Sequence, residues 1–270
     1  MALNAKTITN KEYFYGHKAC GGCGAALAIR LALKVLGDRA IAVIPPNCMS
    51  TVAFIYPHMP LFTNGMIPPF AGTAAVMSGI LAGAKAQGLE DYHVVGFAGD
   101  GGTADIGLQA LSGMIDRNDK AIFICYDNEA YMNTGIQRSS STPRFASATT
   151  TPSGSCSVGK KQNKKDLTEI MAAHNIPYVA QTTFIGNFKD FHEKAHRAIY
   201  TEGPAFVNVM SPCPRGWQYP TEMLPEICKM AVETCVWPLY EIIDGEWHLN
   251  YMPKKKLPVE EFMKLQGRFK

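Results

Sequence analysis

Four cysteines have the residue type and spacing of iron–sulfur ligands. Two form a C-x-x-C pair around two glycines, and the other two stand alone in proline-containing segments further along the chain. They are Cys20, Cys23, Cys48 and Cys213. Four thiolates suit a [4Fe–4S] cluster or a structural zinc ion. Zinc sites more often have a second close pair of ligands, so the isolated third and fourth cysteines favour a cluster.

A second group of residues is suited to binding a metal diphosphate. An apolar stretch, 92–97, runs into Gly99-Asp100-Gly101-Gly102, and a helix is predicted to begin near Ala104. Backbone N–H groups at a helix N-terminus favour phosphate, and glycines permit close backbone approach and positive φ. Because Asp100 would repel a bare phosphate, we expect a bridging Mg²⁺.

A further metal ligand is expected at the end of the next strand along the chain. That strand, 121–126, is followed by Asn128, whose side chain offers an oxygen, and by Ala130, which can offer only its backbone carbonyl. The alternative is that the two segments are unrelated turns, since a lone Gly-Asp-Gly is common in ordinary loops.

The elements that must position these residues alternate along the chain. Apolar periodicity predicts helices over 24–36, 72–87, 104–117, 165–174 and 188–201, and strands over 40–44, 92–97, 121–126, 178–181 and 205–210. Residues 239–243 and 247–251 predict an edge hairpin, and residues 127–163 a long loop. The order predicts an α/β fold with a mostly parallel sheet and helices on both faces. Ligands of such sheets bind at the carboxyl ends of the strands.

Composition narrows the class of protein. Of the 270 residues, 47% are hydrophobic and 18% are charged, which favours a well-buried core. The net charge of +3 and the lysine runs without interleaved aromatics argue against nucleic-acid binding. We find no signal peptide or membrane-length apolar run, so we expect a cytoplasmic protein that does not bind membranes. Cysteines in that compartment are metal ligands or core residues rather than disulfides.

Long motifs around these residues resemble one family, the β subunits of 2-oxoacid:ferredoxin oxidoreductases, in particular pyruvate synthase. The resemblance extends from about Gly16 to about Tyr219. Its strongest parts are Cys20-Gly21-Gly22-Cys23-Gly24, the segments 99–107 and 126–139, and Pro212-Cys213-Pro214-Arg215-Gly216-Trp217. One departure is Asn47, where many relatives have glycine before the third cysteine. Because asparagine tolerates left-handed backbone angles, the fold is expected to survive there.

The resemblance implies a thiamine-diphosphate-binding fold, its cofactors and their ligands. Thiamine diphosphate and Mg²⁺ would be held by Asp100, Asn128 and the Ala130 carbonyl within the loops that contain Gly99, Gly101 and Gly102. The four cysteines would hold one [4Fe–4S] cluster near the thiamine. Asn133 would contact the reacting end of the substrate, with Thr134 and Gly135 nearby. The implied reaction is the reversible oxidative decarboxylation of pyruvate with coenzyme A to acetyl-CoA, CO₂ and reduced ferredoxin.

The resemblance also implies partners. Relatives work in complexes with α, γ and ferredoxin-like δ subunits, and ferredoxin accepts the electrons. The carboxylate that activates thiamine would come from the α subunit, so this chain alone is expected to be inactive.

We assign residues 1–219 to the cofactor-binding domain and residues 220–270 to a C-terminal extension, packed on that domain or on a partner subunit.

Alternatives remain open at the level of the sequence. The same chemistry could act on a branched-chain 2-oxoacid, an aryl-glyoxylate, 2-oxoglutarate or oxalate. A non-redox thiamine-dependent decarboxylase would share the diphosphate loop but need no cluster. A structural zinc-binding protein would leave the diphosphate loop unexplained.

Overall fold

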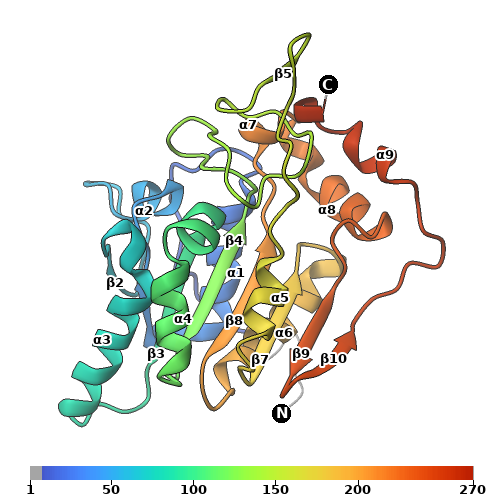
Figure 1. Ribbon diagram of the computed structural model, residues 1–270. Coiled ribbons are helices and arrows are strands. Elements are labelled where there is room, and N and C mark those ends of the chain that lie inside the picture. The colour runs from blue at the N-terminus through green and yellow to red at the C-terminus, as the bar shows by residue number, and fades with distance from the viewer. Residues whose placement is uncertain (1–7, 270) are drawn as a thin grey trace.

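One large sheet organises the chain. The structure is a computed structural model, and it describes residues 8–269. Eight strands form the sheet in the order β10-β9-β7-β8-β4-β3-β1-β2 (Figure 1). From β7 to β2 the neighbouring strands are parallel, whereas β9 is antiparallel to β7 and β10 is antiparallel to β9. The predicted α/β class with a mostly parallel sheet is confirmed.

The strands of the main sheet are short and mostly buried. They are β1 (Ala40–Val43), β2 (Asn64–Met66), β3 (His93–Gly99), β4 (Ile122–Asp127), β7 (Tyr178–Thr182), β8 (Ala205–Met210), β9 (Tyr240–Ile243) and β10 (Glu246–Leu249). The helices are α1 (Gly24–Leu36), α2 (Cys48–Ala53), α3 (Thr73–Ala86), α4 (Leu108–Asp116), α5 (Leu167–Ala172), α6 (Lys189–Ile199), α7 (Pro214–Trp217), α8 (Leu224–Glu233) and α9 (Val259–Met263).

Helices cover both faces of the sheet, as predicted. Alternate strand residues face two separate cores, because side chains along a strand point to opposite faces. On β4, for example, Ile124 packs into the core shared with α1, α6 and α8, whereas Phe123 packs into the core shared with α3, α4 and α5. This two-sided burial explains the near-continuous apolar strands of the sequence.

One predicted helix boundary is wrong, and some short elements were not predicted. The helix expected from residue 104 is preceded by a π-helical turn over Gly101–Asp105, and α4 begins at Leu108. The wide turn arises because the Ile106 N–H donates to the Gly101 carbonyl (3.2 Å) and Thr103 Oγ1 donates to the Gly99 carbonyl (2.8 Å). The short α2 and β2 gave too few residues for a periodic pattern and were not predicted.

The long loop after β4 and the chain beyond residue 219 both lie against this frame. Apart from the two-residue strands β5 (Ser153–Gly154) and β6 (Ser157–Val158), the loop is irregular and crosses the carboxyl edge of the sheet (Figure 1). The predicted edge hairpin is β9–β10, so the last fifth of the chain continues the same sheet. The functional division at residue 219 stays a prediction.

Within residues 8–269, none of the helices has the length and apolar character of a membrane span.

Candidate cofactor site

The diphosphate loop lies where the carboxyl ends of β3 and β4 meet. Strand β3 ends at Gly99, and Asp100 follows it into the buried interior with no exposed surface. Ser139 Oγ donates to Asp100 Oδ2 at 2.5 Å, and the Asn128 backbone N–H donates to Asp100 Oδ1 at 3.3 Å. Burial, and next the charge of Asp127, raise the pKa of Asp100 well above its usual range. A charged carboxylate there therefore requires a compensating cation.

The Asn128 side-chain amide faces two acceptors. One terminal atom of this amide lies 2.9 Å from the Ala130 carbonyl oxygen and 3.0 Å from Asp100 Oδ1. With its nitrogen in that place, the amide donates to both oxygens. With its oxygen there, three oxygens converge with no proton between them, which is the donor set that Mg²⁺ prefers. The three predicted ligands are thus brought together, and their chemistry fits a divalent cation.

The glycines of the loop are needed for close approach rather than for positive φ. A Cβ on Gly101 would lie 2.4 Å from the Tyr131 ring, and one on Gly102 would lie 3.0 Å from the Phe70 ring. None of Gly99, Gly101 and Gly102 has a positive φ. Their missing side chains let the rings of neighbouring segments close over the loop.

A cavity of about 220 Å³ opens over this loop. Gly99, Gly101, Gly102, Asn128, Ala130, Asn133 and Thr134 line it, and so does Cys48. Asp100 lies buried beside it, and Gly135, at φ +119°, does not line it. Seven of the nine predicted cofactor residues and one predicted cluster ligand therefore line one cavity.

Three of the four predicted cluster cysteines lie at the starts of helices. Cys23 precedes α1, Cys48 begins α2 and Cys213 precedes α7, where the Gly216 N–H donates to Cys213 Sγ at 3.4 Å. Unpaired N–H groups at helix starts stabilise a negatively charged sulfur.

The four thiols also influence one another. Burial, opposed by N–H donors and assisted by the charges of Cys213 and Cys20, raises the pKa of Cys23 to about 11. Burial together with the charges of the other three cysteines raises the pKa of Cys48 to about 12. The structure thus gathers the four cysteines in one region. Within residues 8–269, however, no three His, Cys, Asp or Glu side chains surround one point as ligands of a single metal ion.

Two buried tyrosines beside the cysteines have unsatisfied hydroxyls. The hydroxyls of Tyr126 and Tyr219 have no hydrogen-bond partner among the described residues. Burial raises the pKa of both hydroxyls. For Tyr126 the next causes are the thiols of Cys48 and Cys23. For Tyr219 they are the thiols of Cys228, Cys213 and Cys23. An unpaired buried hydroxyl is costly, so these donors fit an acceptor, such as a cluster sulfide, in the space between the cysteines.

Asn47 does not use the left-handed angles that asparagine tolerates. Its backbone is extended, at φ −159° and ψ −171°. The Asn47 side chain accepts from the N–H groups of Met49 (2.8 Å) and Ser50 (3.0 Å), and Ser50 Oγ accepts from the Asn47 N–H (2.9 Å). This capping box begins α2 and positions Cys48.

Glu129 follows Asn128 in the chain but faces away from the cavity. Its carboxylate accepts from Lys164 Nζ (2.9 Å) and from Arg268 Nη2 (2.6 Å). Burial opposes ionisation of Glu129, but the charges of Lys164 and Arg268 outweigh it and lower its pKa.

Two residues of the site were not predicted from the sequence. Ser139 could have been found, because it lies in the 126–139 motif. Nothing in the sequence pointed to Arg268, which is 139 residues from its partner Glu129.

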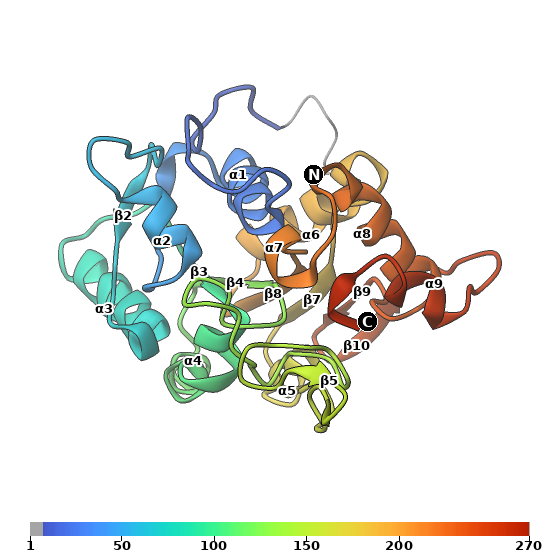
Figure 2. The ribbon, with the colours of Figure 1, turned by 90° about the horizontal axis from the view of Figure 1, so that it is seen from above.

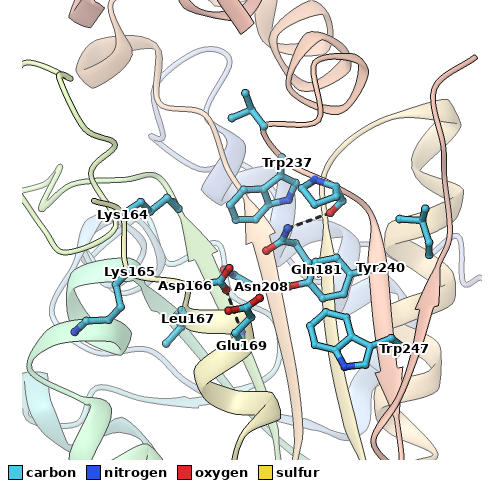
Figure 3. A pocket seen from close by; sticks show the side chains of 13 residues that line it. Lys164, Lys165, Asp166, Leu167, Glu169, Gln181, Asn208, Trp237, Tyr240 and Trp247 are labelled. Carbon is cyan, nitrogen blue, oxygen red and sulfur yellow. Dashed lines mark hydrogen bonds between the residues drawn. The ribbon is translucent and has the colours of Figure 1, made fainter. Parts of the chain in front are cut away.

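A larger cavity lies outside the predicted site. It has a volume of about 500 Å³ and lies between α5 and the β9–β10 hairpin. Figure 3 shows Trp237, Tyr240 and Trp247 on one side of it and Lys164 and Lys165 across from them. None of the residues predicted from the sequence to bind a cofactor lines this cavity.

Comparisons with known proteins agree with the geometry. Residues 47–209 match the family model described as thiamine pyrophosphate enzyme, C-terminal TPP binding domain. Pyruvate synthase subunit PorB of Methanothermobacter thermautotrophicus is 49% identical over 255 residues, 94% of this chain and 88% of that protein. Ketoisovalerate oxidoreductase subunit VorB of Pyrococcus horikoshii is 49% identical over 267 residues, 96% of this chain and 86% of that protein.

A solved structure is similar in fold. The 2-oxoglutarate:ferredoxin oxidoreductase from Magnetococcus marinus, with 2-oxoglutarate, coenzyme A and succinyl-CoA bound, superposes with a TM-score of 0.61 and 25% identity. The alignment covers 77% of this chain and 67% of that one.

Proposed function

Because this chain belongs to the β subunits of 2-oxoacid:ferredoxin oxidoreductases and resembles those of pyruvate synthase, we propose that it acts on pyruvate. The proposed reaction is reversible oxidative decarboxylation with coenzyme A to acetyl-CoA, CO₂ and reduced ferredoxin. The proposed cofactors are thiamine diphosphate, Mg²⁺ and one [4Fe–4S] cluster.

The observation that carries this proposal is the shared cavity. The Gly99–Gly102 loop and Asn128 line it from the diphosphate side, and Cys48 lines it from the cysteine side. Tyr126 lines it too, and after burial the thiols of Cys48 and Cys23 are what raise the pKa of its hydroxyl most. A decarboxylation site and a one-electron acceptor would therefore be neighbours in one chain. A non-redox decarboxylase has no need for that second site.

The metal site would use the three converging oxygens. Asp100 and Asn128 would supply side-chain oxygens and Ala130 its carbonyl, while Ser139 holds the second carboxylate oxygen of Asp100. In the cluster site, Cys20, Cys23, Cys48 and Cys213 would be the ligands. N–H groups at the starts of the helices and the free hydroxyls of Tyr126 and Tyr219 would donate toward sulfur.

Bound thiamine diphosphate would supply the electron sink for decarboxylation, and a bound cluster would accept single electrons. The chain's own residues position and enclose the reactants. Asn133 and Thr134 lie at the exposed rim of the cavity and would contact the substrate. Phe70, Tyr126 and Met132 make the cavity wall apolar and would exclude water from it.

Pyruvate is the first candidate substrate and 2-ketoisovalerate the second. Relatives named for each are 49% identical to this chain, so identity does not separate them. We propose that the complete enzyme includes α, γ and ferredoxin-like δ subunits and passes its electrons to ferredoxin. The relatives' names, which describe subunits, support a multi-subunit complex.

Iron content tests the cluster assignment. The chain purified without oxygen is expected to contain about four iron atoms and to absorb broadly at about 400 nm. Cys48→Ser is expected to lose most of the iron, whereas Cys156→Ser, at an exposed cysteine outside the set, keeps it. Stoichiometric zinc in place of iron would contradict the cluster.

Substrate choice is tested separately on the assembled complex. Reduction of a viologen dye with coenzyme A is compared for pyruvate, 2-ketoisovalerate and 2-oxoglutarate. Pyruvate is expected to give the highest kcat/KM, and a preference for 2-ketoisovalerate would select the second candidate.

A further inference from the structure

The proposed function makes no use of the cavity between α5 and the β9–β10 hairpin, which we call the hairpin cavity. Its volume of about 500 Å³ is in the range of sites for small molecules. Figure 2 shows α5 beside the hairpin, at the end of the sheet away from α2 and α3. The hairpin cavity shares none of its lining residues with the cofactor cavity.

Aromatic rings form one wall of the hairpin cavity (Figure 3). Tyr240 on β9 and Trp247 on β10 lie diagonally across the antiparallel pair and stack with ring centroids 5.1 Å apart. Trp247 is nevertheless 57% exposed. The third ring, that of Trp237, already attracts a cation, since Lys164 Nζ lies 5.1 Å from its centroid. The faces of such rings favour positive charge.

Two carboxylates at the start of α5 line the cavity without a cationic partner. Asp166 and Glu169 are exposed, and neither forms an ion pair within residues 8–269. Burial, and next the charge of Asp166, raise the pKa of the Tyr240 hydroxyl, and the charge of Glu169 adds to them. Both carboxylates therefore act on the aromatic wall.

A chain of buried amides leaves one acceptor of the cavity unpaired. Asn208 Nδ2 donates to Thr168 Oγ1 (3.0 Å), and Thr168 Oγ1 donates to Gln181 Oε1 (2.9 Å). Gln181 Nε2 donates in turn to the Pro238 carbonyl (3.0 Å). This order of donors fixes the amide of Asn208, which lines the cavity and is 2% exposed, and its Oδ1 has no partner among the described residues. An unpaired buried oxygen requires an N–H or O–H donor.

The two lysines of the cavity do not make it a site for anions. Lys164 Nζ pairs with Asp127 Oδ2 (2.6 Å) and Glu129 Oε1 (2.9 Å). Lys165 Nζ lies 3.7 Å from Asp105 Oδ1. Carboxylates outside the lining thus compensate both lysines, whereas the two carboxylates within the lining stay uncompensated.

A metal ion is a poor match for the same cavity. Among residues 8–269, no three His, Cys, Asp or Glu side chains surround one point as metal ligands. Aromatic rings also offer no ligand to a hard cation, which prefers oxygen on all sides.

We propose that the hairpin cavity binds a small organic cation, an alkylammonium or a guanidinium. Its N–H groups would donate to Asp166 and Glu169, and its apolar part would lie against Tyr240 and Trp247. The inference does not rest on the proposed function, because the site uses neither the cysteines nor the diphosphate loop.

Titration calorimetry of the full chain tests the class of ligand. Agmatine, which carries a guanidinium and an ammonium, is expected to bind with a Kd of about 1 mM or tighter. Tetramethylammonium, which has no N–H donor, is expected to bind at least tenfold more weakly, and inorganic phosphate not at all. Absence of agmatine binding, equal binding of tetramethylammonium, or tighter binding of phosphate overturns the proposal.

Removal of the two carboxylates tests the place of binding. Asp166→Asn/Glu169→Gln is expected to weaken agmatine binding at least tenfold, and asparagine can still cap α5 as Asp166 does. Asp244→Asn/Glu246→Gln is the matched control, because it removes two exposed carboxylates from the same hairpin but outside the cavity. Equal affinity of the two double variants overturns the site.

The aromatic wall is tested by a variant that spares the carboxylates. Trp247→Ala is expected to weaken agmatine binding about threefold through loss of the ring face. Tyr200→Ala removes another exposed ring, at the end of α6, and is expected to leave binding unchanged. An unchanged affinity of Trp247→Ala overturns the role of the wall even where the double variant does not fold.

A lysine or arginine side chain of another subunit has the same chemistry as a small organic cation. Agmatine is therefore also titrated into the assembled complex. Binding within threefold of that to the chain alone is expected for a small-molecule site. Loss of binding on assembly would show that a partner's side chain fills the cavity, and it would overturn the proposal.

Discussion

At the residue scale, the turn after β4 points neighbouring side chains in opposite directions. Glu129 has a left-handed backbone, at φ +66°, which separates its side chain from those of the metal-ligand candidates on either side. Its carboxylate joins Arg268, whose guanidinium stacks 3.8 Å from the Trp217 ring centroid. Trp217 Nε1 in turn donates to the Asn128 carbonyl at 2.8 Å. The end of the chain thus braces the turn that carries Asn128 and Ala130.

Arg268→Met tests this brace. Because both Arg268 and Glu129 are buried, removing one partner is expected to cost about 3–5 kcal/mol of unfolding free energy. Arg117→Met is the control, since the half-exposed Arg117 pairs with Asp119 at the surface and should cost less than about 1 kcal/mol. Urea denaturation of the two variants gives the comparison, and equal losses would contradict a special role for Arg268.

At the scale of elements, close backbone contact holds the C-x-x-C loop in place. A Cβ on Gly24 would lie 2.7 Å from the Ser211 backbone, and one on Gly22 would lie 2.5 Å from the Thr221 carbonyl oxygen. The Gly24 N–H donates to the Pro212 carbonyl at 3.2 Å. These contacts bring the start of α1 against the segment that carries Cys213.

Gly22→Ala is expected to disrupt this contact. Gly22 and Gly16 both have φ +68°, but a Cβ on Gly16 meets nothing within 4 Å. Gly16→Ala should therefore cost only the left-handed backbone strain, about 1–2 kcal/mol. Gly22→Ala should cost more and also reduce the iron content. If the two variants melt together and bind equal iron, contact with Thr221 has no role in forming the site.

The segment before α1 is tied to that helix by charge. Glu12 accepts from Arg30 Nε (2.8 Å) and pairs with Lys34 Nζ (2.7 Å). Hydrogen bonding to Arg30, opposed by burial and assisted by Lys34, lowers the pKa of Glu12 from 4.5 to about 2.

A lowered carboxyl pKa predicts a definite pH dependence. The stability that Glu12 contributes is fully present above pH 4.5 and is lost as the pH falls toward about 2. Glu12→Gln is expected to cost about 1 kcal/mol at most at pH 7, because the pair is partly exposed to solvent. Thermal melts of both proteins should converge as the pH falls below 4.5, and a difference that grows in acid would contradict the assignment.

At the scale of the whole molecule, we propose that the chain carries part of an active site. The shared cavity offers a diphosphate loop, metal-ligand candidates and one cysteine of the proposed cluster set but no base among its described lining residues. Under the proposed function, the missing base predicts a functional unit larger than this chain.

The isolated chain is therefore expected to have no 2-oxoacid activity. Its viologen reduction with pyruvate and coenzyme A should be at background even when iron, thiamine diphosphate and Mg²⁺ are bound. Addition of the other subunits should restore the activity. Sustained turnover by the isolated chain would show that a base within it is sufficient.

Much of the fold and of the candidate site could be predicted from the sequence. Strands β4 and β8 are recognisable in the sequence as apolar runs. Helix α1 lies between Cys23 and Gly37, as its apolar periodicity predicts. Two of the elements that escaped prediction, α2 and β2, are too short for a periodic pattern, and they depend on the capping box of Asn47 and on pairing with β1.

The sequence by itself determined the residue types of the site and the strand ends that carry them, because these lie in contiguous motifs with local periodicity. Only the tertiary structure decided which side of its turn Glu129 faces, that Cys48 shares a cavity with the diphosphate loop, and that Arg268 reaches Glu129. The physical reason is the separation along the chain of the residues that interact. Local pattern fixes an element and its buried face, whereas contacts between residues far apart in the chain depend on how whole elements pack.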